Sequence, residues 1–266
     1  MISIMNKRLW IVLAVLVVGT MGSLIWWKSS KETVSEYWKY LDQSKLITVD
    51  DVVAAKIKDA SERGINDFKL SDDDKKIIIP DHYIGKKDSR VIVLQYEDFA
   101  CSHCAEKAST FNKIMDDYQD RVLFIYRHFS LNFPNSTTSI SASEAAYLLG
   151  GEAAFWKMHK ILFQDDSTWT TRRVVSRDEQ RELFSDFATA TEINLDKLFE
   201  TMRDYKGNGI SDKIERDRQL GHATAEAAGI DRDKLGTPMW FVNGQKVDVT
   251  NEDIRKAIDE ALKSAD

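Results

Sequence analysis

The chain contains two cysteines, and both lie in the short stretch FACSHCAEK, residues 99–107. Cys101 and Cys104 are separated by Ser102 and His103, which gives the spacing C-x-x-C. This spacing occurs in redox-active dithiols, in one half of a structural zinc site and in short structural disulfides. The rest of the chain must distinguish these three possibilities.

A structural zinc site needs about four ligands, which usually come from two such pairs. The chain has no second C-x-x-C, and its other histidines are scattered singly, as is typical of surface or core residues: His82, His128, His159 and His222. A structural disulfide between residues three positions apart closes a tiny loop and removes little chain entropy. The sequence therefore favours a redox pair.

Cys101 is expected at the start of a helix, because a β-branched and aromatic run precedes it and a helical segment follows. The unpaired N–H groups and the dipole at a helix start favour an anion, which lowers the pKa of a thiol. We therefore expect Cys101 to be the attacking sulfur and Cys104 the buried resolving thiol. His103 is expected to add positive charge beside the thiolate, and Ser102 to donate a hydrogen bond. A stabilised thiolate makes the disulfide a stronger oxidant.

The elements around the pair read as strand, helix, strand. Residues 91–96 are predicted to form a strand, residues 105–118 a helix and residues 121–129 a second buried strand. Two strands joined in this way are parallel. Residues 77–79 are predicted to form a further strand, separated from the next by a polar turn.

The remainder of the chain is predicted to be helical and then to end in a hairpin and a helix. Helical patterns occupy residues 141–163, with a break at Gly150 and Gly151, and then residues 177–190, 194–205 and 210–228. A strand after Pro238, an Asn243-Gly244 turn and a second strand form the predicted hairpin, before a helix capped at Asn251. The order is βαβ, helical insertion, ββα.

The overall charge argues against a nucleic-acid partner. The 266 residues are 43% hydrophobic and 30% charged, which is typical of a globular protein. The formal net charge is −6. Three basic residues lie before position 29, so the remainder of the chain is more acidic than this total. A chain with this acidic balance is poorly suited to follow a phosphate backbone.

The N-terminal region contains an uncharged apolar segment, residues 9–27. It is just long enough to cross a hydrocarbon core of roughly 30 Å, and Lys7 and Arg8 before it predict a cytoplasmic N-terminus. The alternative is a cleaved signal peptide, for which residues 20–23 offer a small-residue site. Either possibility places the bulk of the chain outside the cytoplasm, where thiols tend to oxidise.

The region between this segment and the main domain is predicted to contain one short amphipathic helix. Thr48 and Asp51 form a capping-box pattern at its start, and apolar residues follow at helical spacing. Its function is open: it serves as a spacer or packs on the main domain.

Three stretches in this order resemble the DsbA-like branch of the thioredoxin superfamily, most closely its membrane-anchored bacterial type: VIVLQYEDFACSHC, EAAYLLGGEAAFWKMHKILF and GTPMWFVNGQKV. The resemblance covers roughly residues 76–265 and implies an α/β, thioredoxin-like fold (βαβ … ββα) with an inserted helical domain. The apolar segment places an N-terminal transmembrane helix before it, and residues 29–74 match nothing in this branch. The expected domains are a cytoplasmic stub and anchor (1–28), a juxtamembrane helical region (29–75), the thioredoxin-like domain (76–135 and 234–266) and the helical insertion (136–233).

The resemblance also implies roles for individual residues. Cys101 is the implied nucleophile and Cys104 the resolving thiol, while Thr237 and Pro238 form a cis-proline loop that faces them and binds substrate. In this branch a histidine before the second cysteine, here His103, favours an oxidising disulfide.

Two positions depart from the pattern of this branch. Ser102 stands between the cysteines where the familiar oxidase form has proline, which leaves the reduction potential open. The branch commonly has a buried acidic residue six positions before the first cysteine, where it assists proton transfer. This chain has Gln95 there, with Glu97 and Asp98 nearby, so the residue that would handle the proton is left open.

The implied function is an extracytoplasmic dithiol oxidase that donates a disulfide to reduced exported polypeptides. It is expected to need no metal or bound cofactor beyond the Cys101–Cys104 disulfide. The expected partners are those polypeptides, a membrane reoxidase of DsbB or VKOR type, and the membrane itself through the N-terminal helix. The alternatives are a disulfide reductase or isomerase on the same fold, and a non-catalytic binding or chaperone module.

Overall fold

The computed structural model describes residues 39–265, except residues 40, 66, 165 and 171–172. The predicted membrane anchor, residues 9–27, lies outside this part of the chain. Of the helices within the described residues, none combines the length and the apolar character needed to cross a bilayer.

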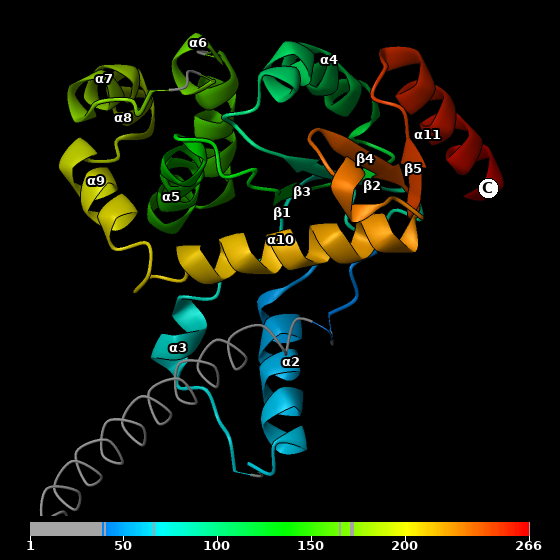
Figure 1. The fold of residues 1–266 in the computed structure, drawn as a ribbon, viewed down its shortest axis with the longest axis horizontal. Helices are drawn as coiled ribbons and strands as arrows, with labels where there is room; N and C mark the ends of the chain where they lie inside the picture. Colours follow the sequence, from blue (N-terminus) through cyan, green and yellow to red (C-terminus); the bar gives the residue numbers. More distant parts are fainter. Residues whose placement is uncertain (1–38, 40, 66, 165, 171–172, 266) are drawn as a thin grey trace, which may run out of the picture.

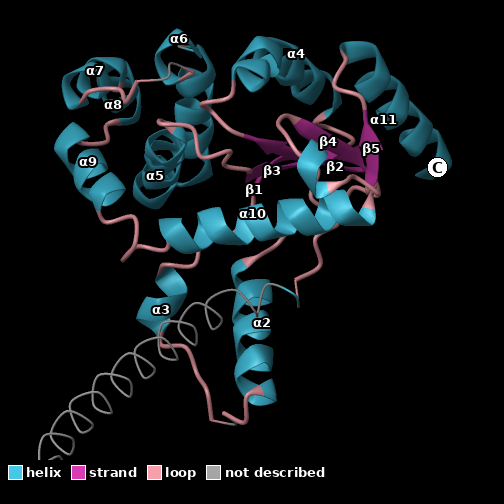
Figure 2. Cartoon of the chain, in the orientation of Figure 1, coloured by secondary structure: helices cyan, strands magenta, loops and turns pink. Residues whose placement is uncertain are grey.

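A five-stranded mixed sheet forms the centre of the molecule (Figure 2). Its strand order is β1-β3-β2-β4-β5, with β2 and β3 parallel and all other neighbours antiparallel. The predicted βαβ unit and the C-terminal hairpin are thus confirmed. Both residues of the hairpin turn, Asn243 and Gly244, have positive φ angles, as a tight two-residue turn requires. The strands are β1 (His82–Gly85), β2 (Ile92–Glu97), β3 (Leu123–His128), β4 (Met239–Val242) and β5 (Gln245–Val247).

The strand predicted at residues 77–79 is wrong, because the first strand begins three residues later, at His82. Ile77 ends the short helix α3 (Asp72–Lys76), and Pro80 cannot donate a backbone hydrogen bond to a sheet. Ile78 is buried in a different place, against the N-terminal helix region.

Helices cover both faces of the sheet (Figure 1). Helices α4 (Ser102–Tyr118) and α11 (Asn251–Ala265) pack on one face, and α10 (Ile210–Ala227) crosses the other. Val93 points into the α4 and α11 side and Leu94 into the α10 side, so β2 is apolar on both faces. The cap of α11 differs from the prediction at Asn251: the Thr250 hydroxyl accepts the Asp253 N–H.

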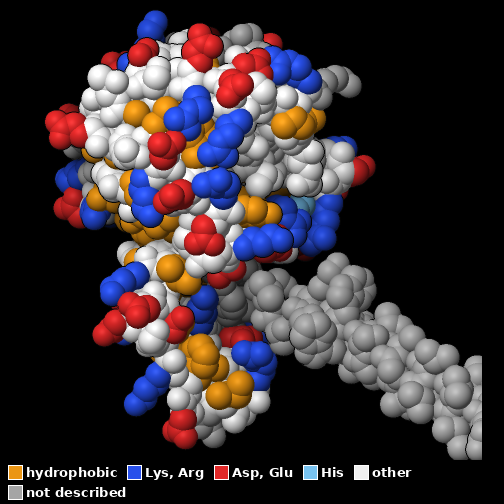
Figure 3. All heavy atoms as spheres, turned by 90° about the vertical axis from the view of Figure 1, so that its left-hand side faces the viewer, with side chains coloured by type: hydrophobic (Ala, Val, Ile, Leu, Met, Phe, Trp, Pro, Cys, Tyr) orange, Lys and Arg blue, Asp and Glu red, His pale blue; other side chains and the backbone are white. Residues whose placement is uncertain are grey.

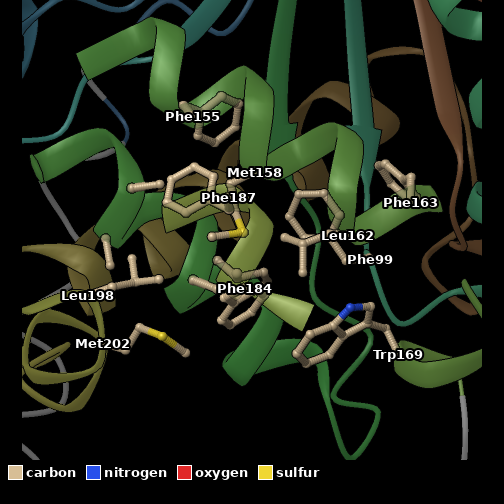
Figure 4. Close-up of a cluster of buried hydrophobic side chains, with 14 of the residues drawn as sticks. Phe99, Phe155, Met158, Leu162, Phe163, Trp169, Phe184, Phe187, Leu198 and Met202 are labelled. Atoms are coloured by element: carbon tan, nitrogen blue, oxygen red, sulfur yellow. The ribbon is translucent and has the colours of Figure 1, made fainter. Parts of the chain in front are cut away.

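The helical insertion packs beside the sheet around an apolar core that also includes Phe99 and Tyr126 (Figure 4). The predicted break in its first helix is present at Gly151, whose φ of 69° is non-helical. The predicted helix over residues 177–190 is instead two short helices, because Phe184 turns into the core at their junction. The helices are α5 (Ser136–Gln164), α6 (Asp166–Trp169), α7 (Arg177–Leu183), α8 (Ser185–Thr191) and α9 (Leu195–Arg203).

The described N-terminal region is attached to the main domain. Helix α2 (Val49–Glu62) begins with the predicted Thr48 capping box and packs through Val52 against Leu220 of α10. Figure 1 shows α2 and α3 projecting from the α10 side of the molecule, and the short 3₁₀ helix η2 (Arg232–Lys234) follows α10.

Charges of both signs are interspersed on the face shown in Figure 3. Lys and Arg side chains alternate there with Asp and Glu side chains, and small apolar areas lie between them. This face offers no continuous basic track.

Candidate active site

Cys101 occupies the N-cap of α4, as the sequence predicted. Its backbone is extended (φ −91°, ψ 119°), its N–H donates to the Asp98 carbonyl at 3.0 Å, and its own carbonyl accepts the Ala105 N–H at 3.1 Å. The two thiols are not joined in this structure, and both cysteines are buried. The sulfur of Cys101 is therefore held at the point where the helix N–H groups are unpaired.

The surroundings of Cys101 favour its thiolate and lower its pKa to about 6. The largest contribution is the hydrogen bond from the Cys104 thiol, which outweighs the opposing effect of burial. Thr237 and the backbone N–H groups of Cys104 and His103 add to it. With this pKa, Cys101 is mostly ionised at neutral pH.

Cys104 behaves in the opposite way. Its side chain is fully buried, and this burial raises the pKa of Cys104 well above its ordinary value. The hydrogen bond to Cys101 and the charges of Glu97 and Cys101 raise it further. One sulfur of the pair is thus an anion at neutral pH and the other is a thiol, which is the division between attacking and resolving cysteine that we expected.

The side chains between the two cysteines face solvent. Ser102 is exposed, and the His103 imidazole is 75% exposed with its Nδ1 3.6 Å from the Glu106 carboxylate. His103 nevertheless contributes to the pKa of Cys101 through its backbone N–H.

The predicted proline loop lies against the reactive sulfur. The Thr237-Pro238 peptide bond is cis, and the Cys101 sulfur lies 3.4 Å from the Thr237 carbonyl oxygen, to which Cys101 donates when it is protonated. Pro238 immediately precedes β4, where the chain does not need its missing N–H. The fold therefore brings together Cys101, Cys104, Thr237 and Pro238, although more than 130 positions of sequence separate the two pairs.

Glu97 is a further acidic group at this site. It is the last residue of β2 and is 1% exposed, and burial raises its pKa to about 8. Trp240 Nε1 donates to its carboxyl group at 3.3 Å, and the nearby Cys101 charge also raises its pKa. At neutral pH this carboxyl group is therefore mostly protonated and lies within electrostatic reach of both sulfurs.

A family profile described as Thioredoxin matches residues 78–260 of the chain. The chain belongs to the thioredoxin family. The matched range includes both cysteines, the cis-proline loop and the helical insertion.

Solved structures share the fold of this thioredoxin-family chain. Oxidised BdbD from Bacillus subtilis is 22% identical, with a TM-score of 0.54 over 69% of this chain and 93% of that one. The thiol-disulfide exchange protein α-DsbA2 from Wolbachia pipientis is 20% identical, with a TM-score of 0.51 over 79% of this chain and 96% of that one. The predicted DsbA-like resemblance is thus confirmed at the level of the fold.

The chain also matches part of some larger proteins. The Na⁺/H⁺ antiporter NhaA 3 of Salinispora tropica is 28% identical over 167 residues, which are 62% of this chain and 22% of the antiporter. NhaA 1 of Mycolicibacterium vanbaalenii is 28% identical over 169 residues, 62% of this chain and 23% of that protein. The chain spans less than a quarter of the length of these curated relatives.

The family position for the buried acid, Gln95, lies on the same face of β2 as Glu97. Gln95 is 1% exposed, and neither its amide nitrogen nor its amide oxygen has a hydrogen-bond partner. An amide at this position cannot take up or release a proton at neutral pH. The sequence did not identify which acidic residue handles the proton. The two-residue period of a strand places residues 95 and 97 on one face, and this period is the pattern that could have indicated Glu97.

Asp98, the second acidic residue close to Cys101 in the sequence, stabilises the loop that carries the cysteines through hydrogen bonds. Its carboxylate accepts the Ala100 N–H at 2.9 Å, the Leu131 N–H at 2.8 Å and the Ser136 hydroxyl at 2.6 Å. These bonds tie the segment before Cys101 to the segment that enters α5. Among the described residues, no three His, Cys, Asp or Glu side chains are grouped so as to hold a metal ion.

Proposed function

We propose that this thioredoxin-family chain is a thiol–disulfide oxidoreductase that donates its Cys101–Cys104 disulfide to reduced exported polypeptides. The proposal rests on the opposite pKa shifts of the two thiols. The site lowers the pKa of Cys101 to about 6, and burial raises that of Cys104 well above its ordinary value.

This asymmetry supports the oxidising direction. A site that stabilises the Cys101 thiolate stabilises the reduced enzyme, so the disulfide accepts electrons more readily. A reductase needs the reverse, because its reduced form must give electrons away.

In the first step, a substrate thiolate attacks the Cys101 sulfur of the enzyme disulfide. The Cys101–Cys104 bond breaks, a mixed disulfide forms at Cys101, and Cys104 leaves with the electron pair. Cys104 then takes a proton, because the pKa of its buried thiol is high. The neighbouring Glu97 carboxyl group, with its pKa of about 8, is the donor at neutral pH.

In the second step, another substrate thiolate attacks the substrate sulfur of the mixed disulfide. Cys101 leaves as a thiolate, which its surroundings stabilise. The substrate has then lost two electrons and gained a disulfide, and the enzyme holds a Cys101 thiolate and a Cys104 thiol. The extended substrate chain lies beside Thr237 and Pro238 during both steps.

The proposal includes a location and a partner. Residues 9–27 anchor the chain in the membrane, and the catalytic domain lies outside the cytoplasm. A membrane reoxidase of DsbB or VKOR type removes the two electrons and restores the disulfide. Fusion of a periplasm-dependent reporter after residue 266 tests the location: an inactive reporter contradicts it.

Trapping of mixed disulfides tests the function. In a Cys104→Ser variant the Cys101 thiolate can attack a disulfide of an exported protein, which forms a mixed disulfide and releases the other substrate sulfur as a thiolate. Cys104 is then absent and cannot attack the mixed disulfide, so adducts with exported proteins should accumulate on non-reducing gels. The Cys101→Ser, Cys104→Ser double variant is the matched control and should form none. A gel without adducts from the single variant contradicts the proposal.

The reduction potential of the Cys101–Cys104 couple decides the direction. A value toward about −120 mV supports the oxidase, whereas a value near roughly −270 mV supports a reductase. Equilibration with glutathione redox buffers measures it.

A further inference from the structure

A group of buried ionisable side chains lies where the helical insertion meets the sheet. It consists of His82 on β1, His128 on β3, and Glu144 and Glu152 on α5, and we call it the histidine–glutamate cluster. The side chains of His82, His128 and Glu144 are fully buried, and that of Glu152 is 33% exposed. The proposed exchange of thiols and disulfides does not use any of them.

Both ring nitrogens of His82 face carboxylate groups. Nε2 lies 3.0 Å and 3.1 Å from the two oxygens of Glu144, and Nδ1 lies 3.1 Å from Oε1 of Glu152. An ionised carboxylate only accepts hydrogen bonds, whereas a neutral imidazole carries only one N–H. Two such contacts are both satisfied when both nitrogens of His82 carry hydrogen.

The other bonds of these carboxylates fit the ionised form. Glu144 also accepts from His128 Nε2 at 2.6 Å, and Glu152 Oε2 accepts the donor-only indole N–H of Trp156 at 3.1 Å. Each carboxylate is therefore surrounded by donors rather than acceptors. His82 and His128 together hold the pKa of Glu144 well below its ordinary value, against the effect of burial.

His82 joins the two halves of a broken helix. Glu144 lies before the non-helical Gly151 of α5, and Glu152 comes directly after it. The next turn supplies Phe155, whose ring stacks on the His82 ring with centroids 3.5 Å apart and planes 12° apart. A cation over an aromatic face is a favourable arrangement, and more so when it is buried.

We propose that His82 is a buried imidazolium at neutral pH that binds both halves of α5 to the edge strand β1, and that this joint weakens when His82 loses its proton at alkaline pH. The inference goes beyond the proposed function and does not depend on the reaction at the cysteines.

The balance of buried charge supports a proton on His82. The cluster adjoins a second buried network, because the Asp217 carboxylate accepts the His128 backbone N–H at 3.0 Å. In the described part of the chain, the two networks together contain four carboxylates and three permanent cations, so a charged His82 balances the fourth carboxylate. The carboxylates are Asp81, Glu144, Glu152 and Asp217, and the cations are Arg127, Lys213 and Arg216.

The other histidines and tyrosines around the cluster are neutral, and the Lys213 ammonium is the cation that opposes a proton on His82. Burial lowers the pKa of His128, which donates from Nε2 and has no partner at Nδ1. Burial lowers the pKa of His159 on α5 to about 3, and it raises the pKa values of Tyr126 on β3 and Tyr147 on α5. His82 is therefore the histidine of the cluster that carries the charge.

The direction of the pH effect follows from the same contacts. Burial alone would lower the pKa of His82, but Glu144 and Glu152 outweigh it and raise the pKa above its ordinary value. A raised histidine pKa stabilises the folded protein below the unfolded-state pKa of about 6.5, and this stabilisation is lost as the pH rises through the folded-state value.

The joint also borders the loop that carries the cysteines. Phe99, two residues before Cys101, contacts His128, His159 and Phe163, with ring centroids 4.8–5.8 Å apart. Figure 4 shows Phe99 next to Leu162 and Phe163 of the second half of α5. Loosening of this half of α5 removes packing from one side of Phe99.

Histidine NMR of the full-length protein tests the proposal. The chain has five histidines, so ¹³Cε1-labelled histidine gives five resolvable signals. We expect His82 to remain protonated on both nitrogens at pH 7.5 and to titrate only above the ordinary histidine range. A His82 signal that is neutral at pH 7 overturns the proposal.

Glu152→Gln is the diagnostic variant, because its partly exposed side chain is replaced by a neutral one of the same shape. The His82 midpoint should fall by about one pH unit when this negative charge is lost. Glu106→Gln is the matched control: it removes a carboxylate beside an exposed histidine, His103, and should leave the His82 midpoint unchanged. An unchanged His82 midpoint in Glu152→Gln also overturns the proposal.

Discussion

Trp240 Nε1 lies 3.3 Å from Oε1 of Glu97 and donates to it, so that β4 supplies a hydrogen-bond donor to a buried acid at the end of β2. This bond gives the buried Glu97 carboxyl group one hydrogen-bond donor. A single neutral donor does not offset burial, and the pKa of Glu97 therefore stays near 8. The acid can hold a proton at neutral pH at a place where the buried thiol of Cys104 needs one.

Glu97→Gln should slow the reduction of the enzyme disulfide by a dithiol peptide at pH 7 by at least about tenfold, because Cys104 then lacks its proton donor. In the wild type, the rate corrected for substrate thiolate should fall above about pH 8, where Glu97 loses its proton. The variant should lack this inflection. Stopped-flow tryptophan fluorescence measures both rates.

Gln95→Met is the control for that experiment, since it changes a buried neutral side chain on the same strand face. It should retain the inflection near pH 8. If Glu97→Gln retains it as well, another group supplies the proton.

Gln95→Met should also stabilise the fold. The buried amide of Gln95 has no hydrogen-bond partner, and an apolar side chain of similar size removes the cost of its desolvation. We expect the free energy of unfolding in urea to rise by about 1–2 kcal/mol. The exposed Gln164→Met should change it by less than about 0.5 kcal/mol. A loss of stability in Gln95→Met would show that the amide has a partner.

The Cys101 thiol should react with iodoacetamide with a midpoint near pH 6, well below that of an ordinary cysteine. In Cys104→Ala the midpoint should rise by about one pH unit, because the largest stabilising hydrogen bond is lost. Mass spectrometry of the alkylated peptide follows the reaction. A midpoint near 8.5 in the wild type contradicts the electrostatic basis of the site.

The reduced protein should gain stability relative to the oxidised protein as the pH rises from 5 to 8. The pKa of Cys101 is depressed in the folded state, so its contribution is present above the unfolded-state value and is lost as the pH falls through about 6. The oxidised protein has no thiol to ionise and lacks this term. Thermal unfolding of both forms measures the difference, and Cys101→Ser, which cannot form the disulfide, should show no such gain relative to the oxidised wild type.

Removal of residues 39–47 should destabilise the main domain. Arg127 donates to the carbonyls of Gln43 and Lys45 at 2.8 Å, and the Ile47 N–H donates to Asp81 at 3.0 Å. Hydrogen bonds to charged groups contribute about 1.5–3 kcal/mol each, and both charged partners are buried. Urea unfolding of a chain that starts at residue 48 should give a loss of more than about 3 kcal/mol against one that starts at residue 39. Equal stability contradicts this assignment.

Local patterns in the sequence determined much of the fold. The parallel βαβ unit, the Asn243-Gly244 hairpin and the helix that begins at Cys101 were all predicted correctly. Each depends on the period of apolar residues or on a few adjacent residues, because backbone geometry couples neighbours directly.

The local pattern did not predict the secondary structure correctly where tertiary packing competes with β propensity. Residues 77–79 have the composition of a strand, yet they form a helix end and a buried loop, because Pro80 and packing against the N-terminal region outweigh β propensity.

The tertiary structure alone decided which polar groups meet. The sequence indicated that Cys101 should ionise, and its resemblance to the DsbA-like branch implied that Thr237 faces it, but only the folded chain places Glu97 within reach of both thiols. It likewise gathers His82 and His128, which are far apart along the chain, around one glutamate. Contacts of this kind depend on how separate elements pack, and the pKa values depend on the burial that packing creates. The spacing of apolar residues along the sequence indicates neither these contacts nor these pKa values.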